Sequence, residues 1–207
     1  MCCDYINECR ENCHFNTHNF ESCGLRCFLN TINEERRKCP EEINLINELE
    51  EVYRNAWNAH IHSRARGRAT GAAFERWIRE QIGNPPGVEV QSGGIVQFSV
   101  FRFPADILIT TSSSNQMVIL EVKYILDRQQ ALFIGGLLYF LEENMKLGIV
   151  TFARPREDCI NILEHFKKHF KNEKPERFDY FFIQSDEKGK NGWSTSIKRL
   201  KSFCNLA

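Results

Sequence analysis

The sequence lacks any apolar stretch long enough to cross a bilayer. Its longest apolar run, Ala131 to Leu141, contains only 11 residues, whereas a membrane-spanning helix needs about 20. The N-terminal segment also lacks the basic and apolar regions of a secretory signal peptide. We therefore expect a soluble protein that has no membrane partner and is located in the cytoplasm.

The chain also lacks a net charge, because 27 Lys and Arg residues balance 27 Asp and Glu residues. Only local clusters of charge can therefore indicate a polyanionic partner. Basic clusters occur at 62–68, at 154–156 and in the tail from Lys188 to Lys201. Arginine binds phosphates and guanine edges, so the candidate DNA contacts are Arg64, Arg66, Arg68, Arg154 and Arg156. For each cluster, a solvated surface that serves only solubility is an equal alternative.

Cysteine is scarce in most of the chain and concentrated at one end. Seven of the nine cysteines lie within the first 39 residues. This asymmetry predicts a separate Cys-rich module at residues 1–40, followed by a domain at residues 41–207. A unit of about 40 residues buries too little apolar surface to be stable alone, so we expect a metal or disulfides to stabilise it.

Two C-x3-C pairs offer four thiolates for that purpose. On a helix, residues four apart share a face, so each of two helical turns presents two thiols toward one point. Four thiolates form a closed structural Zn²⁺ site, although an iron–sulfur cluster takes the same ligands and disulfides of a helical hairpin also fit the spacing. The predicted set is Cys9, Cys13, Cys23 and Cys27, with Cys2, Cys3, Cys39, His14 and His18 as substitutes.

Beyond residue 40 the hydrophobic pattern alternates between helix and strand. Apolar residues at three- and four-residue spacing predict helices at 43–57, 70–82, 128–144 and 156–170. Between the first two we expect a basic loop broken by Gly67, with Thr70 as the N-cap of the second helix. Runs rich in β-branched and aromatic residues predict strands at 88–91, 95–103, 105–110, 117–125, 147–152 and 178–184. This order predicts an α/β (α+β) fold in which helices flank a mixed sheet.

Two of these strands carry charged residues within apolar runs. Glu121 and Lys123 are two residues apart, so their side chains project from one face, and Asp106 lies on the strand before the Ser-rich turn. If the two strands pair, the three groups meet. Charges in such a strand cost free energy unless they are paired or metal-bound. Two carboxylates suit Mg²⁺, which activates water, and a lysine stabilises developing negative charge. A plain salt bridge is the alternative interpretation.

The motif Pro104-Ala105-Asp106, followed after 14 residues by Glu121-Val122-Lys123, resembles that of the PD-(D/E)XK nuclease superfamily, which includes the restriction endonucleases. The resemblance implies an αβββαβ core over residues 65–185, with Asp106, Glu121 and Lys123 as catalytic residues and Mg²⁺ held by the two carboxylates. It also implies a further acidic residue, Glu75, on the helix before the sheet. Because Glu75 lies among arginines, a solvated charge on that helix is an equal alternative. The sequence departs from the motif at Ala105, which separates Pro104 from Asp106. The family tolerates this insertion, because the proline is not a ligand.

The resemblance implies a Mg²⁺-dependent endonuclease that hydrolyses DNA phosphodiester bonds. The absence of helicase or P-loop signatures favours a sequence-specific Type II restriction endonuclease that acts on double-stranded DNA. We expect a homodimer, because two-fold symmetry matches a palindromic site. The alternatives are a repair or recombination nuclease, such as a junction resolvase or a structure-specific endonuclease, and a zinc-containing DNA-binding protein on a non-catalytic nuclease fold.

Overall fold

A computed structural model describes the backbone of residues 17–60, 62–112, 115–152, 154–171, 176–185 and 192–206. The chain divides into two compact units. Unit 1 comprises Met1–Phe74 and Ser185–Trp193, and unit 2 comprises Glu75–Gln184 and Ser194–Ala207. The predicted boundary after residue 40 falls within unit 1 in this division.

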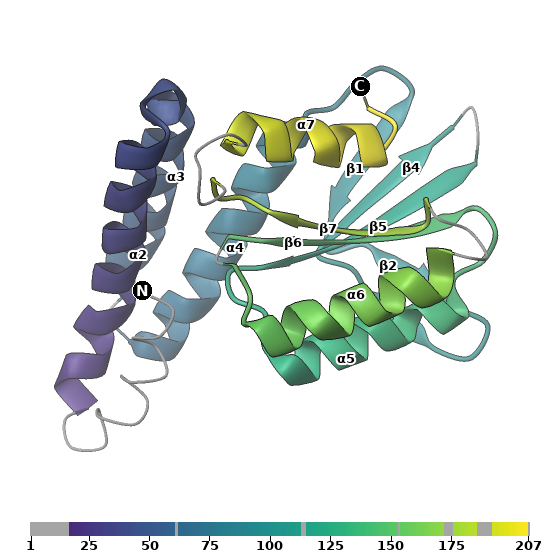
Figure 1. Cartoon of the computed structure of the whole chain (residues 1–207), viewed down its shortest axis with the longest axis horizontal. Coiled ribbons are helices and arrows are strands. Elements are labelled where there is room, and N and C mark those ends of the chain that lie inside the picture. The colour runs from purple at the N-terminus through teal and green to yellow at the C-terminus, as the bar shows by residue number, and fades with distance from the viewer. Residues whose placement is uncertain are drawn as a thin grey trace. The chain divides into compact units, whose positions relative to one another are not determined.

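Unit 1 is built from helices. They are α2 (Thr17–Lys38), the short 3-10 helix η1 (Pro40–Glu42), α3 (Ile43–Asn58) and the first part of α4 (Ser63–Ile82). Helices α2 and α3 lie side by side (Figure 1). Phe28 of α2 stacks on Tyr53 of α3 with ring centroids 3.7 Å apart. Apolar burial between the two helices therefore stabilises this unit.

Helix α4 begins at Ser63, so the predicted basic loop at 62–68 is wrong. Gly67 lies within the helix, and the Thr70 hydroxyl donates to the Arg66 carbonyl at 2.9 Å instead of capping a helix start. Arg66 explains the early start, because its Nε donates to the His60 carbonyl at 2.7 Å and its guanidinium lies 5.1 Å from the Trp57 ring centroid. These contacts offset the cost of about 1 kcal/mol for a glycine within a helix.

A buried carboxylate joins distant parts of unit 1. Glu35 on α2 is 2% exposed. Its Oε2 accepts hydrogen bonds from the backbone N–H and the hydroxyl of Ser185, both at 2.8 Å, and from Trp193 Nε1 at 2.9 Å. Three donors on one oxygen satisfy a charge that would otherwise be costly to bury. Helix α2 is therefore tied to residues about 150 positions later in the chain.

Unit 2 contains a five-stranded mixed sheet in the order β1-β4-β5-β6-β7. Strands β1, β4 and β5 pair antiparallel, and β5, β6 and β7 pair parallel. The expected α+β class with a mixed sheet and flanking helices is thus confirmed. The strands are β1 (Val88–Ser92), β4 (Ile107–Thr111), β5 (Gln116–Lys123), β6 (Met145–Thr151) and β7 (Phe178–Phe182).

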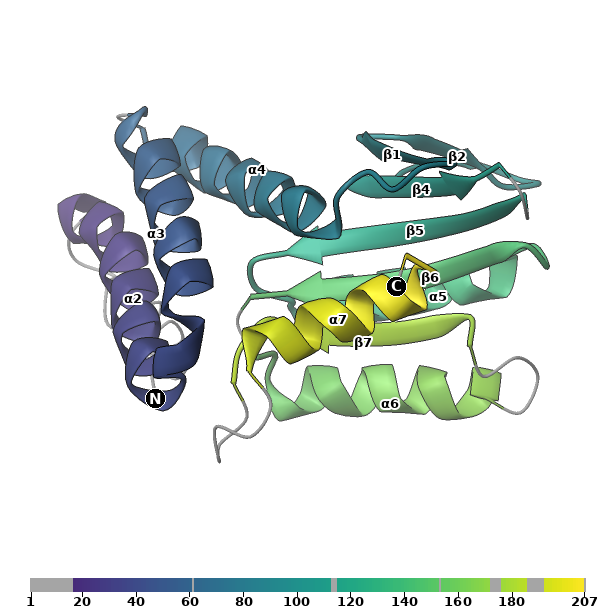
Figure 2. The same cartoon turned by 90° about the horizontal axis from the view of Figure 1, so that it is seen from above.

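Helices cover both faces of this sheet. Figures 1 and 2 show α5 (Arg128–Leu137) and α6 (Glu157–Lys171) on one face and α7 (Trp193–Phe203) on the other. The sequence did not predict α7, because its many basic residues obscure the buried positions Ile197 and Leu200. Within the described ranges, none of the helices combines the length and the apolar character needed to span a bilayer.

Two predicted elements are shorter than expected. The strand predicted at 95–103 is a hairpin of β2 (Ile95–Gln97) and β3 (Arg102–Pro104), because the Phe98 N–H donates to the Phe101 carbonyl at 2.9 Å and closes a turn. The helix predicted at 128–144 ends at Leu137 and continues only as the 3-10 helix η2 (Leu138–Phe140), after which Leu141 is extended.

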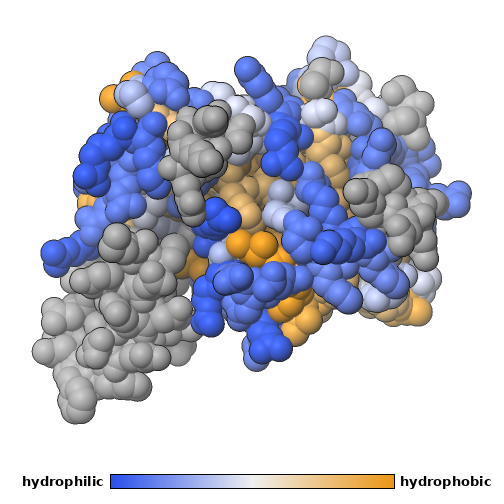
Figure 3. All heavy atoms as spheres, in the orientation of Figure 1, coloured by the Kyte–Doolittle hydropathy of each residue, from blue (hydrophilic) through white to orange (hydrophobic). Residues whose placement is uncertain are grey.

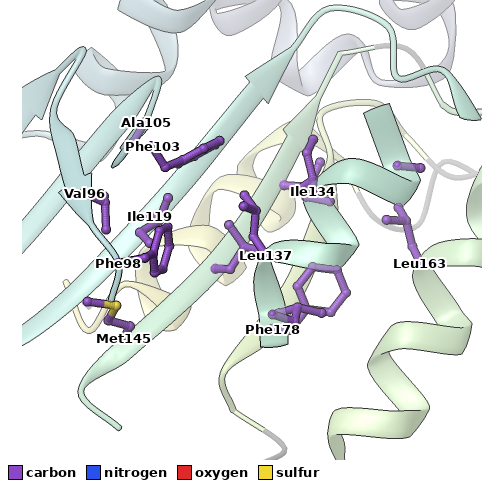
Figure 4. Packing of buried hydrophobic residues seen from close by; sticks show 14 of the residues in the cluster. Val96, Phe98, Phe103, Ala105, Ile119, Ile134, Leu137, Met145, Leu163 and Phe178 are labelled. Carbon is purple, nitrogen blue, oxygen red and sulfur yellow. The ribbon is translucent and has the colours of Figure 1, made fainter. Parts of the chain in front are cut away.

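The main hydrophobic cluster fills the space between the sheet and the α5–α6 layer (Figure 4). Ile119 of β5 and Leu147 and Ile149 of β6 belong to it. Glu121 and Lys123 continue the row of alternate side chains that contains Ile119, so they lie on the same sheet face. The apolar cluster therefore gives way to charged residues at the carboxyl end of β5.

Candidate functional site

The structure brings together the three residues on which the sequence analysis converged. Ile107 of β4 pairs with Leu120 of β5 in antiparallel register, which places Asp106 opposite Glu121. Lys123 Nζ lies 2.6 Å from Asp106 Oδ2 and 2.9 Å from Glu121 Oε2. One ammonium therefore bridges two carboxylates at the end of β5.

Backbone hydrogen bonds hold Asp106 in place. Its Oδ2 accepts from the Val122 N–H at 2.8 Å, and its carbonyl accepts from the Gly93 N–H at 2.9 Å. Gly93 has a φ of 68°, which glycine adopts readily. The next residue, Gly94, packs so closely that an added Cβ would lie 2.7 Å from Leu108 Cβ. The 93–94 turn thus holds the backbone of Asp106, and the Val122 N–H orients its carboxylate.

Glu121 is the most buried member of the group, with its side chain 6% exposed. Its Oε1 has no hydrogen-bond partner among the described residues. Burial, together with the negative charge of Asp106, raises the pKa of Glu121 to about 7, although Lys123 opposes the shift. The surroundings therefore leave the Glu121 Oε1 oxygen without a donor, and they compensate the charge of the Glu121 carboxylate only in part.

For Lys123, in contrast to Glu121, the surroundings favour the charged form. Burial lowers its pKa, but the charges of Glu121 and Asp106 outweigh burial, and the net pKa lies above its ordinary value. The lysine is therefore protonated at neutral pH. In this arrangement it can donate hydrogen bonds and supply positive charge.

Glu75 on α4 belongs to the same electrostatic environment. Its carboxyl makes a hydrogen bond with the side chain of Ser92, at the end of β1. Burial raises the pKa of Glu75, and the charge of Asp106 raises it further. The predicted fourth acid thus lies close enough to Asp106 for the charge of Asp106 to disfavour the ionised form of Glu75.

The sequence pattern did not reveal Thr151 at the end of β6. In the parallel register Thr151 pairs with Lys123, so both side chains lie on the same face of the sheet. The residue is fully buried, and its Oγ1 has no hydrogen-bond partner within the part of the chain that the structure describes. The only sign of this residue in the sequence is that a polar side chain directly follows the apolar run Leu147–Val150.

The oxygen atoms of this site suit a divalent cation. Across the described ranges, no three His, Cys, Asp or Glu side chains are grouped as a ready metal site. Asp106 and Glu121 nevertheless supply two carboxylates, and Glu121 Oε1 is a buried acceptor without a donor. Mg²⁺ characteristically binds through one or two carboxylates and keeps several waters. The donor set fits such an ion.

The predicted arginines belong to both units. Arg66 is held by His60 and Trp57 in unit 1. Arg68 and Arg154 are exposed, and Arg156 Nε lies 3.5 Å from Asp158 Oδ1. The side chain of Arg64 lies outside the described residues. Their role as DNA contacts stays a prediction.

Of the four cysteines predicted to form the thiolate cluster, only Cys27 has a side chain within the described residues. Cys9, Cys13 and the side chain of Cys23 lie outside the described residues, as do Cys2, Cys3, His14 and the side chain of His18. Cys27 is half-buried on α2, and Cys39 is a buried free thiol whose pKa burial raises. The zinc, iron–sulfur and disulfide alternatives all stay predictions.

Comparison with known proteins adds little to this geometry. No family model matches the chain, and no curated protein matches its sequence. Among solved structures, it is similar to the crystal structure of a protein of unknown function, AF1548, with a TM-score of 0.35 and 15% sequence identity. The match covers 55% of this chain and 58% of that chain, little more than half of each.

Proposed function

We propose that this protein is a Mg²⁺-dependent endonuclease that hydrolyses DNA phosphodiester bonds. The observation that carries the proposal is the convergence of Asp106, Glu121 and Lys123 at the end of β5, with a buried Glu121 oxygen left without a donor. A structural salt bridge alone does not account for that oxygen, because a buried unsatisfied acceptor costs about 1–3 kcal/mol. A divalent cation would satisfy it.

Each residue has a distinct role in the proposed reaction. Asp106 and Glu121 would hold the cation, which would polarise a phosphoryl oxygen and lower the pKa of a bound water molecule. Lys123 carries a proton at neutral pH, because its pKa is raised. It therefore stabilises negative charge that develops on the phosphate and acts as a donor rather than a base. Glu75 adds negative charge beside Asp106 and strengthens the attraction for the cation.

The more specific proposal is a Type II restriction endonuclease acting on duplex DNA. All three polar residues of the motif are present, backbone hydrogen bonds position Asp106, and Lys123 contacts both carboxylates, which favours a catalytic protein over a non-catalytic DNA-binding one. Sequence specificity would then depend on the exposed basic positions, including Arg154 and Arg156.

The test uses the purified full-length chain and long unmethylated duplex DNA, with Mg²⁺ or EDTA. The key variant is Lys123→Met, which removes the charge but keeps the length of the side chain. The matched control is Lys168→Ala, which alters an exposed lysine on α6. We expect cleavage that requires Mg²⁺, is lost in Lys123→Met by a factor of about 100 or more, and is unchanged in the control.

The product pattern distinguishes the alternatives. Discrete fragments support a restriction endonuclease. A smear, or cleavage confined to branched substrates, supports a nuclease of the repair or recombination type. If folded wild-type protein cleaves no duplex, branched or single-stranded substrate, the nuclease proposal is wrong.

A further inference from the structure

Helix α5 and the 3-10 turn η2 expose an apolar face, here called the α5 face. It consists of Leu132, Phe133, Gly136, Tyr139 and Phe140. The four large side chains are between 42% and 65% exposed. Their spacing of three and four residues places them in one stripe along the helix. Hydrophobic side chains are visible at the surface in Figure 3, in the region where Figure 1 draws α5.

The hairpin of β2 and β3 extends this face at one end. Phe101 packs edge-on against Phe140 with ring centroids 5.0 Å apart. Val100, at the tip of the same hairpin, is 72% exposed. The apolar surface is thus continuous from the helix to the hairpin, and a monomer rarely leaves such a patch uncovered.

Two neighbouring glycines on α5 have opposite surroundings. A Cβ at Gly135 would meet the Phe166 ring at 2.0 Å, so this glycine is required by packing against α6. A Cβ at Gly136 would meet no atom within 4 Å. Packing within the chain therefore explains Gly135 but not Gly136, even though glycine weakens a helix by about 1 kcal/mol relative to alanine. A glycine in the middle of an exposed apolar stripe lets another helix approach closely.

The charges at the two ends of the α5 face are complementary. Arg128 is exposed at the amino end, and Glu142 and Glu143 are exposed just beyond the carboxyl end. If a second copy of the helix crosses antiparallel at Gly136, Leu132 and Phe133 of one copy lie over Phe140 and Tyr139 of the other. The same two-fold relation places Arg128 beside the acidic end of the partner helix, twice per interface.

From this arrangement we infer that the α5 face binds the α5 face of a second copy of the chain, and that the protein is a two-fold symmetric dimer. An aromatic side chain carries about 150–250 Å² of surface, so the exposed apolar parts amount to roughly 500 Å² per copy. With a polar rim, two copies approach the lower limit of about 1,200 Å² for specific interfaces. We therefore expect a dimer that dissociates at micromolar concentrations. The inference does not depend on nuclease activity.

The experiment is sedimentation velocity of the full-length chain over a concentration series, in a reducing buffer so that no disulfide contributes. Gly136→Glu introduces bulk and charge at the crossing point, and the open space around Gly136 means that the fold should tolerate it. Phe133→Glu removes an anchor of the face. Each should raise the dimer dissociation constant by about tenfold or more. The matched control, Ile43→Glu, alters an exposed apolar residue in unit 1 and should have no effect.

A charge reversal makes the test specific to the antiparallel arrangement. Arg128→Glu should weaken the dimer, and combining it with Glu142→Arg and Glu143→Arg should restore it. A wild-type chain that stays monomeric at about 100 µM, well above the expected dissociation constant, overturns the inference. So does a dimer that Gly136→Glu and Phe133→Glu leave unchanged. Loss of cleavage in Lys123→Met with the dimer intact would separate this inference from the proposed function.

Discussion

Glu121 occupies a position where the fold disfavours its charged form. Its pKa is about 7 in the folded chain against an ordinary value of 4.5, because burial and Asp106 outweigh the attraction of Lys123. Between these two pH values the folded state holds more protons than the unfolded state. The free energy of unfolding therefore falls as the pH rises from 4.5 to about 7. A residue that costs stability at neutral pH is consistent with retention for a ligand rather than for the fold.

This cost predicts that Glu121→Gln stabilises the protein at alkaline pH. In EDTA at pH 8 we expect the free energy of unfolding, measured by urea denaturation, to rise by roughly 1–3 kcal/mol. Near pH 4.5 the variant and the wild type should be alike, because Glu121 is then protonated in the folded state. Glu80→Gln, at an exposed position on α4, is the control and should show no such pH-dependent difference. A variant less stable than wild type at pH 8 would contradict the assigned cause.

Addition of Mg²⁺ should reverse the order of stability. A cation that binds only the folded state stabilises it in proportion to the logarithm of its concentration above the dissociation constant. We expect Mg²⁺ to raise the melting temperature of the wild type at pH 8 and to have little effect on Glu121→Gln or Asp106→Asn. Equal shifts in all three proteins would show that these carboxylates do not hold the ion.

The candidate site was largely predictable from the sequence at the residue scale. Glu121 and Lys123 share a face because a strand alternates every two residues, and the short turn before β5 brings Asp106 beside them. Thr151 was not predictable, because β5 and β6 pair in parallel and α5 lies between them in the chain. No local spacing reveals such a pairing.

At the element scale, the packing of α5 predicts opposite effects of alanine at its two adjacent glycines, Gly135 and Gly136. Gly135→Ala should destabilise the protein by about 1–3 kcal/mol, because its Cβ would displace the Phe166 ring and separate α5 from α6. Gly136→Ala should instead stabilise the helix by about 0.5–1 kcal/mol, because its Cβ meets open space. Urea denaturation at one low protein concentration compares the two. Equal effects would mean that the tight α5–α6 contact at Gly135 is not formed.

Elements were predicted well where one physical signal dominated. The strands of the sheet are apolar runs bounded by turn residues, and α6 has a clear apolar stripe, so all were found within a few residues. The start of α4 was missed because arginines and Gly67 resemble a loop, whereas contacts of Arg66 with His60 and Trp57 stabilise a helix there. The 95–104 hairpin was missed because its turn contains no glycine or proline to mark it.

At the scale of the whole molecule, the organisation depends on contacts between distant parts of the chain. Cysteine content suggested a module ending at residue 40, yet Phe28 packs on Tyr53 and Glu35 binds Ser185 and Trp193. These partners are separated by about 25 to 160 positions in the sequence. Composition cannot reveal them, because a buried carboxylate on a helix looks like any surface glutamate until its donors are known.

The Glu35 contacts predict that α2 does not fold independently of the later chain. Glu35→Ala leaves three donors without their shared acceptor, so we expect a loss of about 2–4 kcal/mol in the free energy of unfolding. Glu35→Gln is the matched control, because its amide oxygen can replace Oε2 and the loss should be much smaller. Urea denaturation followed by tryptophan fluorescence reports the change, since Trp193 is fully buried.

A chain that begins at residue 41 extends this test. It lacks Phe28 as well as Glu35, so it should be less stable than Glu35→Ala, with a lower urea midpoint. If residues 1–40 instead form an independent module, the shortened chain should unfold at the wild-type midpoint and Glu35→Ala should cost little. That outcome would place the division after residue 40 and would remove Ser185 and Trp193 from the interactions that stabilise the N-terminal helices.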